Sequence, residues 1–291
     1  MKSKRGRAGL SSMRVARLAG LLIAFVLLAS CSKTTVDDSR AVQPPVEPGS
    51  SAGGAPPISE IISRYESTDR STDSTTRLKA TVESQDTGKP EAIQLAIHRK
   101  KEPDGIQHYL VDFIAPPQER DRNALINVSP VGQIEATRYT QSSGSFLTAR
   151  SATDEESLFG LTLQELVGGQ PEKYDYKLIG EERYGGKPVY RVEGTLKPGE
   201  ESRFTRTVML ISKENYTAPV IEAYDNQGQL ARNLTATKFD EVNGNWVRWQ
   251  WTIDNQEHHK KIDFQVIDAK FNQNLPESMF SRDSLKKSAS K

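Results

Sequence analysis

The side chains best suited to catalysis or metal binding are sparse and scattered in this sequence. It has one cysteine, Cys31, and four histidines, of which His258 and His259 are adjacent and would point to opposite sides of a strand. His98 and His108 lie at the edges of neighbouring apolar runs and could pair across a hairpin, but a metal site needs three or four ligands. We therefore interpret the histidines as solvated surface residues and expect no metal site.

Sequence signatures of common enzyme sites are also missing. We find no Gly-x-Ser-x-Gly nucleophile elbow, no phosphate-binding loop and no His-Glu-x-x-His pair. The carboxylates are dispersed, and Asp112, which alone interrupts a strongly apolar run, is expected to point outward. The sequence thus predicts no catalytic residues, no cofactor and no enzyme activity.

The first 30 residues have the parts of a secretory signal peptide. They carry six basic and no acidic side chains, and residues 18–30 are mostly apolar. That run is about 13 residues long, too short to span a bilayer that needs roughly 20. Leu28, Ala29, Ser30 and Cys31 then resemble the lipobox of bacterial lipoproteins.

The lipobox resemblance implies cleavage before Cys31 and acylation of that residue with palmitate-type chains. Two or three chains anchor a protein stably, whereas one binds only marginally. Ser32 stands where inner-membrane lipoproteins of enteric bacteria usually carry Asp, which favours the periplasmic side of the outer membrane over the inner membrane. The alternative is a single buried thiol in an uncleaved anchor helix.

The remaining chain begins with a tether and continues with a helix. Residues 31–57 are rich in proline and glycine and too poor in large apolar side chains to fold. Ile58, Ile61, Ile62 and Tyr65 recur at helical spacing, which predicts an amphipathic helix over 57–70. This stripe either packs on the main core or forms a lid over a ligand cavity.

From residue 77 the apolar pattern changes to period two, which is typical of antiparallel strands. Asn243-Gly244 predicts a tight hairpin turn, and a change of parity near Val266 predicts a β-bulge. We expect about eleven strands, at residues 78–83, 93–98, 109–114, 124–128, 174–180, 189–196, 203–212, 218–224, 230–239, 245–254 and 261–271.

The strand predicted over 245–254 has the most marked apolar face. Regular alternation places Val247, Trp249, Trp251 and Ile253 together, opposite a polar face. With Phe264 of the next strand, these residues are candidates for the wall of a ligand cavity. Plain core packing explains them equally well.

An insert at residues 153–169 separates the early strands from the late ones. Its acidic start and apolar content predict one or two short helices on the apolar face of the sheet. Leu158, Phe159 and Leu163 are the candidates to act as a lid together with the first helix. A short helix around 284–287 and a polar tail at 288–291 end the chain.

Three stretches of the sequence resemble the LolA/LolB superfamily of lipoprotein-sorting proteins. They are Ala115-Pro116-Pro117 with the following residues 121–125, the segment 157–166, and Phe271-Asn272-Gln273-Asn274-Leu275-Pro276. Residues 133–148 depart from the pattern, and the lid-locking arginine of the soluble carrier has no counterpart that we can place. The resemblance covers roughly residues 58–287.

The resemblance implies a mainly β (α+β) fold, a strongly curved antiparallel half-barrel of about eleven strands with short helices covering its concave face. The chain would comprise a signal peptide (1–30), a lipidated tether (31–57), the half-barrel domain (58–287) and the tail.

The implied function is binding of lipid or lipoprotein acyl chains in a hydrophobic cavity, for lipoprotein sorting or lipid transport in the cell envelope. Its partners would be those chains, the membrane and an envelope transporter. Nucleic acid is excluded, because the chain without residues 1–30 carries a net charge of about −5. The alternative is a non-catalytic interaction module of the same fold, a sensor or scaffold subunit of a membrane complex.

Overall fold

The structure, a computed structural model, describes residues 47–48, 54–84, 88, 90–150, 160–161, 165, 168 and 171–289, without the side chains of residues 47, 48, 121 and 289. All of these lie within the unit Pro44–Lys291. The predicted signal peptide, Cys31 and most of the tether lie outside the described residues, as do the lid candidates Leu158, Phe159 and Leu163.

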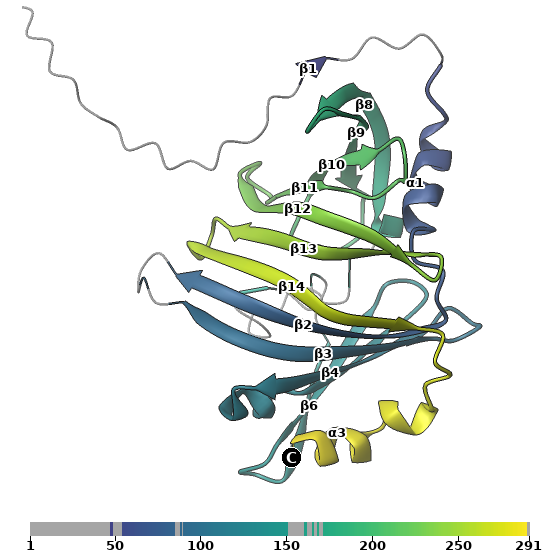
Figure 1. The fold of residues 1–291 in the computed structure, drawn as a ribbon. Coiled ribbons are helices and arrows are strands. Elements are labelled where there is room, and N and C mark those ends of the chain that lie inside the picture. The colour runs from purple at the N-terminus through teal and green to yellow at the C-terminus, as the bar shows by residue number, and fades with distance from the viewer. Residues whose placement is uncertain are drawn as a thin grey trace, which may run out of the picture. The chain divides into compact units, whose positions relative to one another are not determined.

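The period-two segments form one open antiparallel sheet (Figure 1). In the described part of the chain it has 14 strands in the order β1-β8-β9-β10-β11-β12-β13-β14-β2-β3-β4-β5-β6-β7, so that two meanders join where β14 pairs with β2. The strands are β1 (Glu47–Pro48), β2 (Asp73–Ser84), β3 (Glu91–Lys101), β4 (Gln107–Ala115), β5 (Ala124–Val128), β6 (Ile134–Thr140), β7 (Ser145–Ala149), β8 (Tyr174–Tyr184), β9 (Lys187–Leu196), β10 (Arg206–Ser212), β11 (Val220–Tyr224), β12 (Leu230–Val242), β13 (Asn245–Asn255) and β14 (Lys260–Phe271).

The prediction of a mainly β, antiparallel fold is confirmed, but the strand count was too low. The eleven predicted strands correspond to β2–β5 and β8–β14. The structure adds the two-residue β1 and the hairpin β6–β7, which occupies the segment that departs from the LolA pattern. The sequence did not predict this hairpin, because its Ser and Thr residues weaken the apolar alternation. Its strands still pair through the backbone hydrogen bonds of an antiparallel sheet.

The β-bulge predicted near Val266 is confirmed, because the register between β14 and β2 shifts between Val266 and Asp268. The sequence did not predict a second irregularity, between β12 and β13. There the pairing shifts between Ala236 and Lys238, and again between Lys238 and Phe239. This second irregularity changes which side chains of β13 share a face.

The first helix, α1 (Ile58–Glu66), is shorter than the predicted 57–70. The hydroxyl groups of Ser67 and Thr68 donate to the carbonyls of Ser63 and Tyr65, at 2.6 and 2.8 Å. Such bonds satisfy the last carbonyls of a helix and end it. Ile61 is completely buried, so the apolar stripe packs on a core, but on a smaller cluster than the main core on which it was expected.

One apolar row crosses the sheet on the face that carries α1. Directly paired residues of neighbouring strands share a face, and the pairs run from Met209 through Ile221, Leu234 and Ile253 to Ile262. We call this side of the sheet the inner face. It carries two clusters, one beneath α1 over β8–β11 and a larger one over β12–β14 and β2–β6.

The other side, the outer face, is covered at one end by the C-terminal segment (Figure 1). The short helix η3 (Glu277–Phe280) and α3 (Arg282–Ala289) pack Leu285 against Leu110, Leu125 and Tyr139. The predicted C-terminal helix is therefore present and longer than expected, and Ser288 belongs to it rather than to a tail. Ser288 also hydrogen-bonds to Asp112, so this carboxylate points outward, as predicted.

Candidate functional site

The larger inner-face cluster contains three of the five predicted wall residues. Ile253 and Phe264 are buried members, and Trp251 packs against them. The rings of Trp251 and Phe264 stack at a centroid distance of 4.7 Å with an interplanar angle of 10°. Leu161 of the insert is almost completely buried in the same cluster. The part of the insert that is described therefore touches the inner face.

The other two predicted wall residues lie elsewhere. The register shifts opposite β13 interrupt its alternation. The ring of Trp249 faces the Lys238 ammonium at 6.0 Å, while the guanidinium of Arg248 lies 5.9 Å from the ring of Trp251. Val247 is buried but belongs to neither inner-face cluster. The expectation that Val247, Trp249, Trp251 and Ile253 share one face is wrong, and Arg248 takes a place on the inner face.

Helix α1 brings the four predicted lid residues onto the inner face. Ile58, Ile61, Ile62 and Tyr65 pack against Tyr190, Val192, Met209 and Ile211. Burial raises the pKa of the Tyr65 phenol, and the charge of Arg248 partly offsets this rise. Tyr65 thus links the cluster beneath α1 to Arg248 on β13.

A buried arginine fixes the insert at one end of β12 and β13. The side chain of Arg232 is only 4% exposed and forms ion pairs with Glu165 at 2.9 Å and Glu257 at 2.6 Å. It also donates to the Asn255 side chain at 2.7 Å and to the Gly160 carbonyl at 2.9 Å. Sequence reasoning missed this network, because the partners are far apart in the chain and no spacing connects them.

Gly160 has no room for a side chain in this network. Its φ is +81°, and an added Cβ would lie 2.8 Å from the His258 ring. A glycine is therefore required where the insert meets the turn after β13.

A cavity of about 630 Å³ opens where the two ends of the sheet approach each other. Its volume falls within the roughly 300–1,000 Å³ of small-molecule sites. Ile134 connects it to the larger inner-face cluster. Its described lining comes from the strands around β5–β7 and from the segments flanking β8 and β9: Ile106, Asn127, Ser129, Gly132, Gln133, Ile134, Glu135, Arg150, Lys173 and Glu201.

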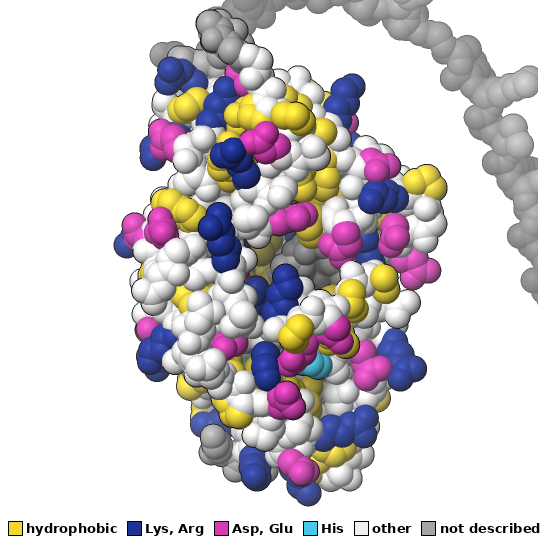
Figure 2. Space-filling view, turned by 90° about the vertical axis from the view of Figure 1, so that its right-hand side faces the viewer, with side chains coloured by type: hydrophobic (Ala, Val, Ile, Leu, Met, Phe, Trp, Pro, Cys, Tyr) yellow, Lys and Arg dark blue, Asp and Glu magenta, His cyan; other side chains and the backbone are white. Residues whose placement is uncertain are grey.

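None of the five predicted wall residues lines this cavity. The sequence did not predict this cavity, because the residues that line it come from both meanders and no local sequence pattern connects them. Seen from the side, the molecule is hollowed near its middle, and charged side chains of both signs surround the hollow (Figure 2).

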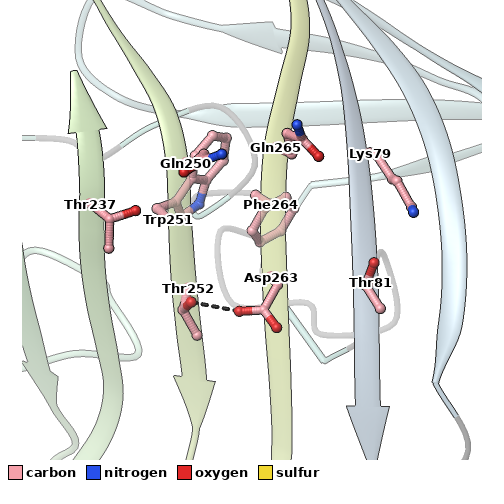
Figure 3. A pocket seen from close by; sticks show the side chains of 9 residues that line it. All are labelled: Lys79, Thr81, Thr237, Gln250, Trp251, Thr252, Asp263, Phe264 and Gln265. Carbon is pink, nitrogen blue, oxygen red and sulfur yellow. Dashed lines mark hydrogen bonds between the residues drawn. The ribbon is translucent and has the colours of Figure 1, made fainter. Parts of the chain in front are cut away.

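A second, smaller cavity of about 280 Å³ lies on the outer face (Figure 3). Lys79 and Thr81 line it, and they alternate along β2 with the buried Leu78 and Ala80. Thr252 donates to Asp263 at 2.6 Å in its wall. Apart from Trp251 and Phe264, the residues that line it are polar or charged, as are most of those that line the larger cavity.

His98 and His108, which could have paired across a hairpin, have separate partners. His98 lies 3.1 Å from the Thr75 hydroxyl and 3.7 Å from Asp112, whereas His108 bonds to Asn127 at 2.7 Å. Among the described residues, no group of three or more histidine, cysteine, aspartate or glutamate side chains is arranged to hold a metal ion. The described helices include none long and apolar enough to cross a membrane.

These features define a mainly β fold, one open antiparallel sheet with a helix on its inner face. The structure of a DUF1329 family protein from Desulfovibrio piger matches it with a TM-score of 0.71 and 19% identity, over 78% of this chain and 96% of that one. The structure of an outer membrane lipoprotein-sorting protein domain from Vibrio parahaemolyticus gives the same TM-score and identity, over 78% and 97%. A LolA superfamily protein from Nitrosomonas europaea matches with a TM-score of 0.64 and 14% identity, over 79% and 100%.

The resemblance to the LolA superfamily is confirmed at the level of the fold. A protein-family model described as "Uncharacterized protein" matches residues 105–287, more than half of the sequence, and the chain belongs to that family. A search of curated proteins gives no match.

Proposed function

We propose that this protein is a lipid-anchored, non-enzymatic component of a bacterial cell envelope that binds an acyl chain of a lipid or lipoprotein on its inner face. The observation that carries the proposal is the inner face itself. An apolar surface shared by many strands continues through Ile134 into a cavity of about 630 Å³. The fold supports it, because two structures with this fold are described as a lipoprotein-sorting domain and a LolA superfamily protein.

Lipid binding is tested by purifying the chain that begins at residue 32, without the predicted signal peptide and Cys31, in detergent-free buffer and analysing bound lipids by native mass spectrometry. We expect a stoichiometric amphiphile that a fluorescent fatty-acid probe displaces. A chain that carries no lipid and binds no probe would contradict the proposal.

The anchor is tested separately by fractionating cells that express the unaltered chain or the Cys31→Ser variant. We expect the unaltered chain in the outer-membrane fraction, because acylated Cys31 holds it there. The variant should remain unprocessed. Normal processing and outer-membrane fractionation of the variant would show that Cys31 is not the anchor.

An interaction module is the second candidate function, and one feature favours it. β7 is the last strand in the sheet order, so one of its edges is unpaired within the described chain. Leu147 on this strand is 67% exposed. A partner could add a strand at such an edge. Substituting Leu147 with Lys would abolish binding of such a partner without affecting lipid binding.

A further inference from the structure

Arg248 differs from the other arginines held close to the inner face because its charge is not paired. The guanidinium forms no hydrogen bond or ion pair with any described residue, and its Nε is buried without a partner. The Nε of Arg99 is also buried without a partner, but its terminal nitrogens pair with Asp69 at 2.8 Å and donate to the Ser71 hydroxyl at 2.6 Å, so its charge is compensated. A guanidinium has five N–H donors, and buried donors in native proteins are nearly always satisfied. The exception at Arg248 therefore needs an explanation.

Aromatic rings surround Arg248 without providing acceptors for its N–H groups. The guanidinium carbon lies 5.8 Å from the ring centroid of Phe239 and 5.9 Å from that of Trp251. Rings at this distance attract a cation weakly and exclude water. Glu66, next to Tyr65 in the chain, forms no described ion pair with Arg248. The charge thus stays uncompensated in a setting that strengthens its attraction for an anion.

Arg248 lies between the two apolar clusters of the inner face. Trp251 belongs to the larger cluster, and Tyr65 of α1 belongs to the cluster over β8–β11. The charge of Arg248 acts on the Tyr65 phenol, so the two side chains are close. An apolar chain lying along either cluster could therefore place a polar head at this guanidinium.

The same region extends toward the cavity of about 630 Å³. Glu66 follows Tyr65, and the pKa of its carboxyl is raised by burial and by the neighbouring charge of Glu172. Glu172 belongs to the short helix η2 (Pro171–Lys173), and Lys173 lines the cavity. Tyr65, which is influenced by Arg248, is thus connected to the cavity-lining Lys173 through Glu66 and Glu172.

We propose that Arg248 binds the anionic head group, a carboxylate or a phosphate, of the amphiphile whose acyl chain lies on the inner face. This inference rests on the proposed function and adds the chemical class of the ligand. The planar guanidinium can bind two oxygens of such a group at once, and charge-assisted bonds of this kind are the stronger hydrogen bonds in proteins. A neutral head group could accept a hydrogen bond from the guanidinium, but it would leave the buried charge uncompensated.

The test compares amphiphiles that share one acyl chain and differ only in the head group. Oleate, oleoyl lysophosphatidate and the neutral oleyl alcohol are each titrated against the uncharged probe N-phenylnaphthylamine bound to the chain that begins at residue 32, which is the parent chain here. We expect half-displacement by both anions at a concentration at least tenfold lower than by oleyl alcohol. If only one anion shows this preference, its head group is the one recognised.

The Arg248→Met variant retains most of the aliphatic side chain and removes the charge. We expect it to weaken displacement by the anions at least tenfold and to leave displacement by oleyl alcohol unchanged. Arg248→Lys keeps the charge but not the paired donors and should fall between the two. Arg77→Met is the matched control, because Arg77 is half-exposed on β2 with one long ion pair to Asp268 at 3.5 Å, and it should behave like the parent chain.

Two outcomes separate this inference from the proposed function. If oleyl alcohol and oleate bind the parent chain equally, or if Arg248→Met weakens both equally, the inner face binds acyl chains but Arg248 does not select anions. If no amphiphile displaces the probe, the proposed function fails and the inference with it. The comparison of head groups on the parent chain needs no variant, so it stands even if Arg248→Met does not fold.

Discussion

The two ends of the β12–β13 pair each carry an arginine close to the inner face, and the two have opposite surroundings. At one end, Arg232 binds two carboxylates, an amide and a backbone carbonyl. At the other end, Arg248 has aromatic neighbours and no acceptor among the described residues. The first arrangement is complete and holds the insert in place. The second lacks an acceptor for the guanidinium, and we propose that the head group of a ligand supplies one.

The largest expected difference between the two ends is in stability. Arg232→Met leaves Glu165 and Glu257 without their cation, and breaking a buried pair in this way costs about 3–5 kcal/mol. Arg248→Met removes a charge that has no partner, so the free energy of unfolding should change by less than about 1 kcal/mol or increase. Urea unfolding of both variants measures this. Equal losses would show that the two arginines are equivalent structural residues.

The second-largest expected difference is between the stability losses caused by truncating the two tryptophans, Trp249 and Trp251, on either side of the register shift. Trp251→Ala removes a ring stacked on Phe264 within the core and should cost about 3–5 kcal/mol. Trp249→Ala removes a ring outside that cluster and should cost no more than about 2 kcal/mol. Thermal and urea unfolding compare the two. If Trp251→Ala instead abolishes lipid binding at nearly unchanged stability, Trp251 lines the ligand cavity rather than the core.

The smallest expected effect is on the pH dependence at the Arg232 end. Burial raises the pKa of the Glu257 carboxyl, but hydrogen bonds and charges from Arg203 and Arg232 outweigh it and hold the pKa below its ordinary value of 4.5. The folded state then binds fewer protons than the unfolded state around this pH. The contribution to stability is present above pH 4.5 and is lost as the pH falls through the lower folded-state pKa.

The measurement is the free energy of unfolding between pH 7 and pH 3. The slope of its acid decrease should be smaller in Glu257→Gln than in the parent chain. Glu60→Gln, at an exposed position of α1, is the control and should keep the parent slope. A Glu257→Gln variant with the parent slope would show that this carboxylate does not couple folding to protons.

Much of the fold could be predicted because the signals are local. The repeat of Ile58, Ile61, Ile62 and Tyr65 predicts a helix, and the parity change near Val266 predicts a bulge that the structure confirms. The candidate site was predicted less well. Trp251, Ile253 and Phe264 do lie together, but Trp249 does not join them, because the irregular pairing of β12 interrupts the alternation of β13.

The sequence by itself determined the antiparallel meanders, the first and last helices and the class of the fold, since each depends on residue periodicity and turn chemistry over a few positions. Only the tertiary structure decided that β14 pairs with β2, that Arg232 finds Glu165 and Glu257, and that Arg248 faces inward. These outcomes depend on the register between separate strands, and one irregular pair of residues changes the face on which every following side chain lies.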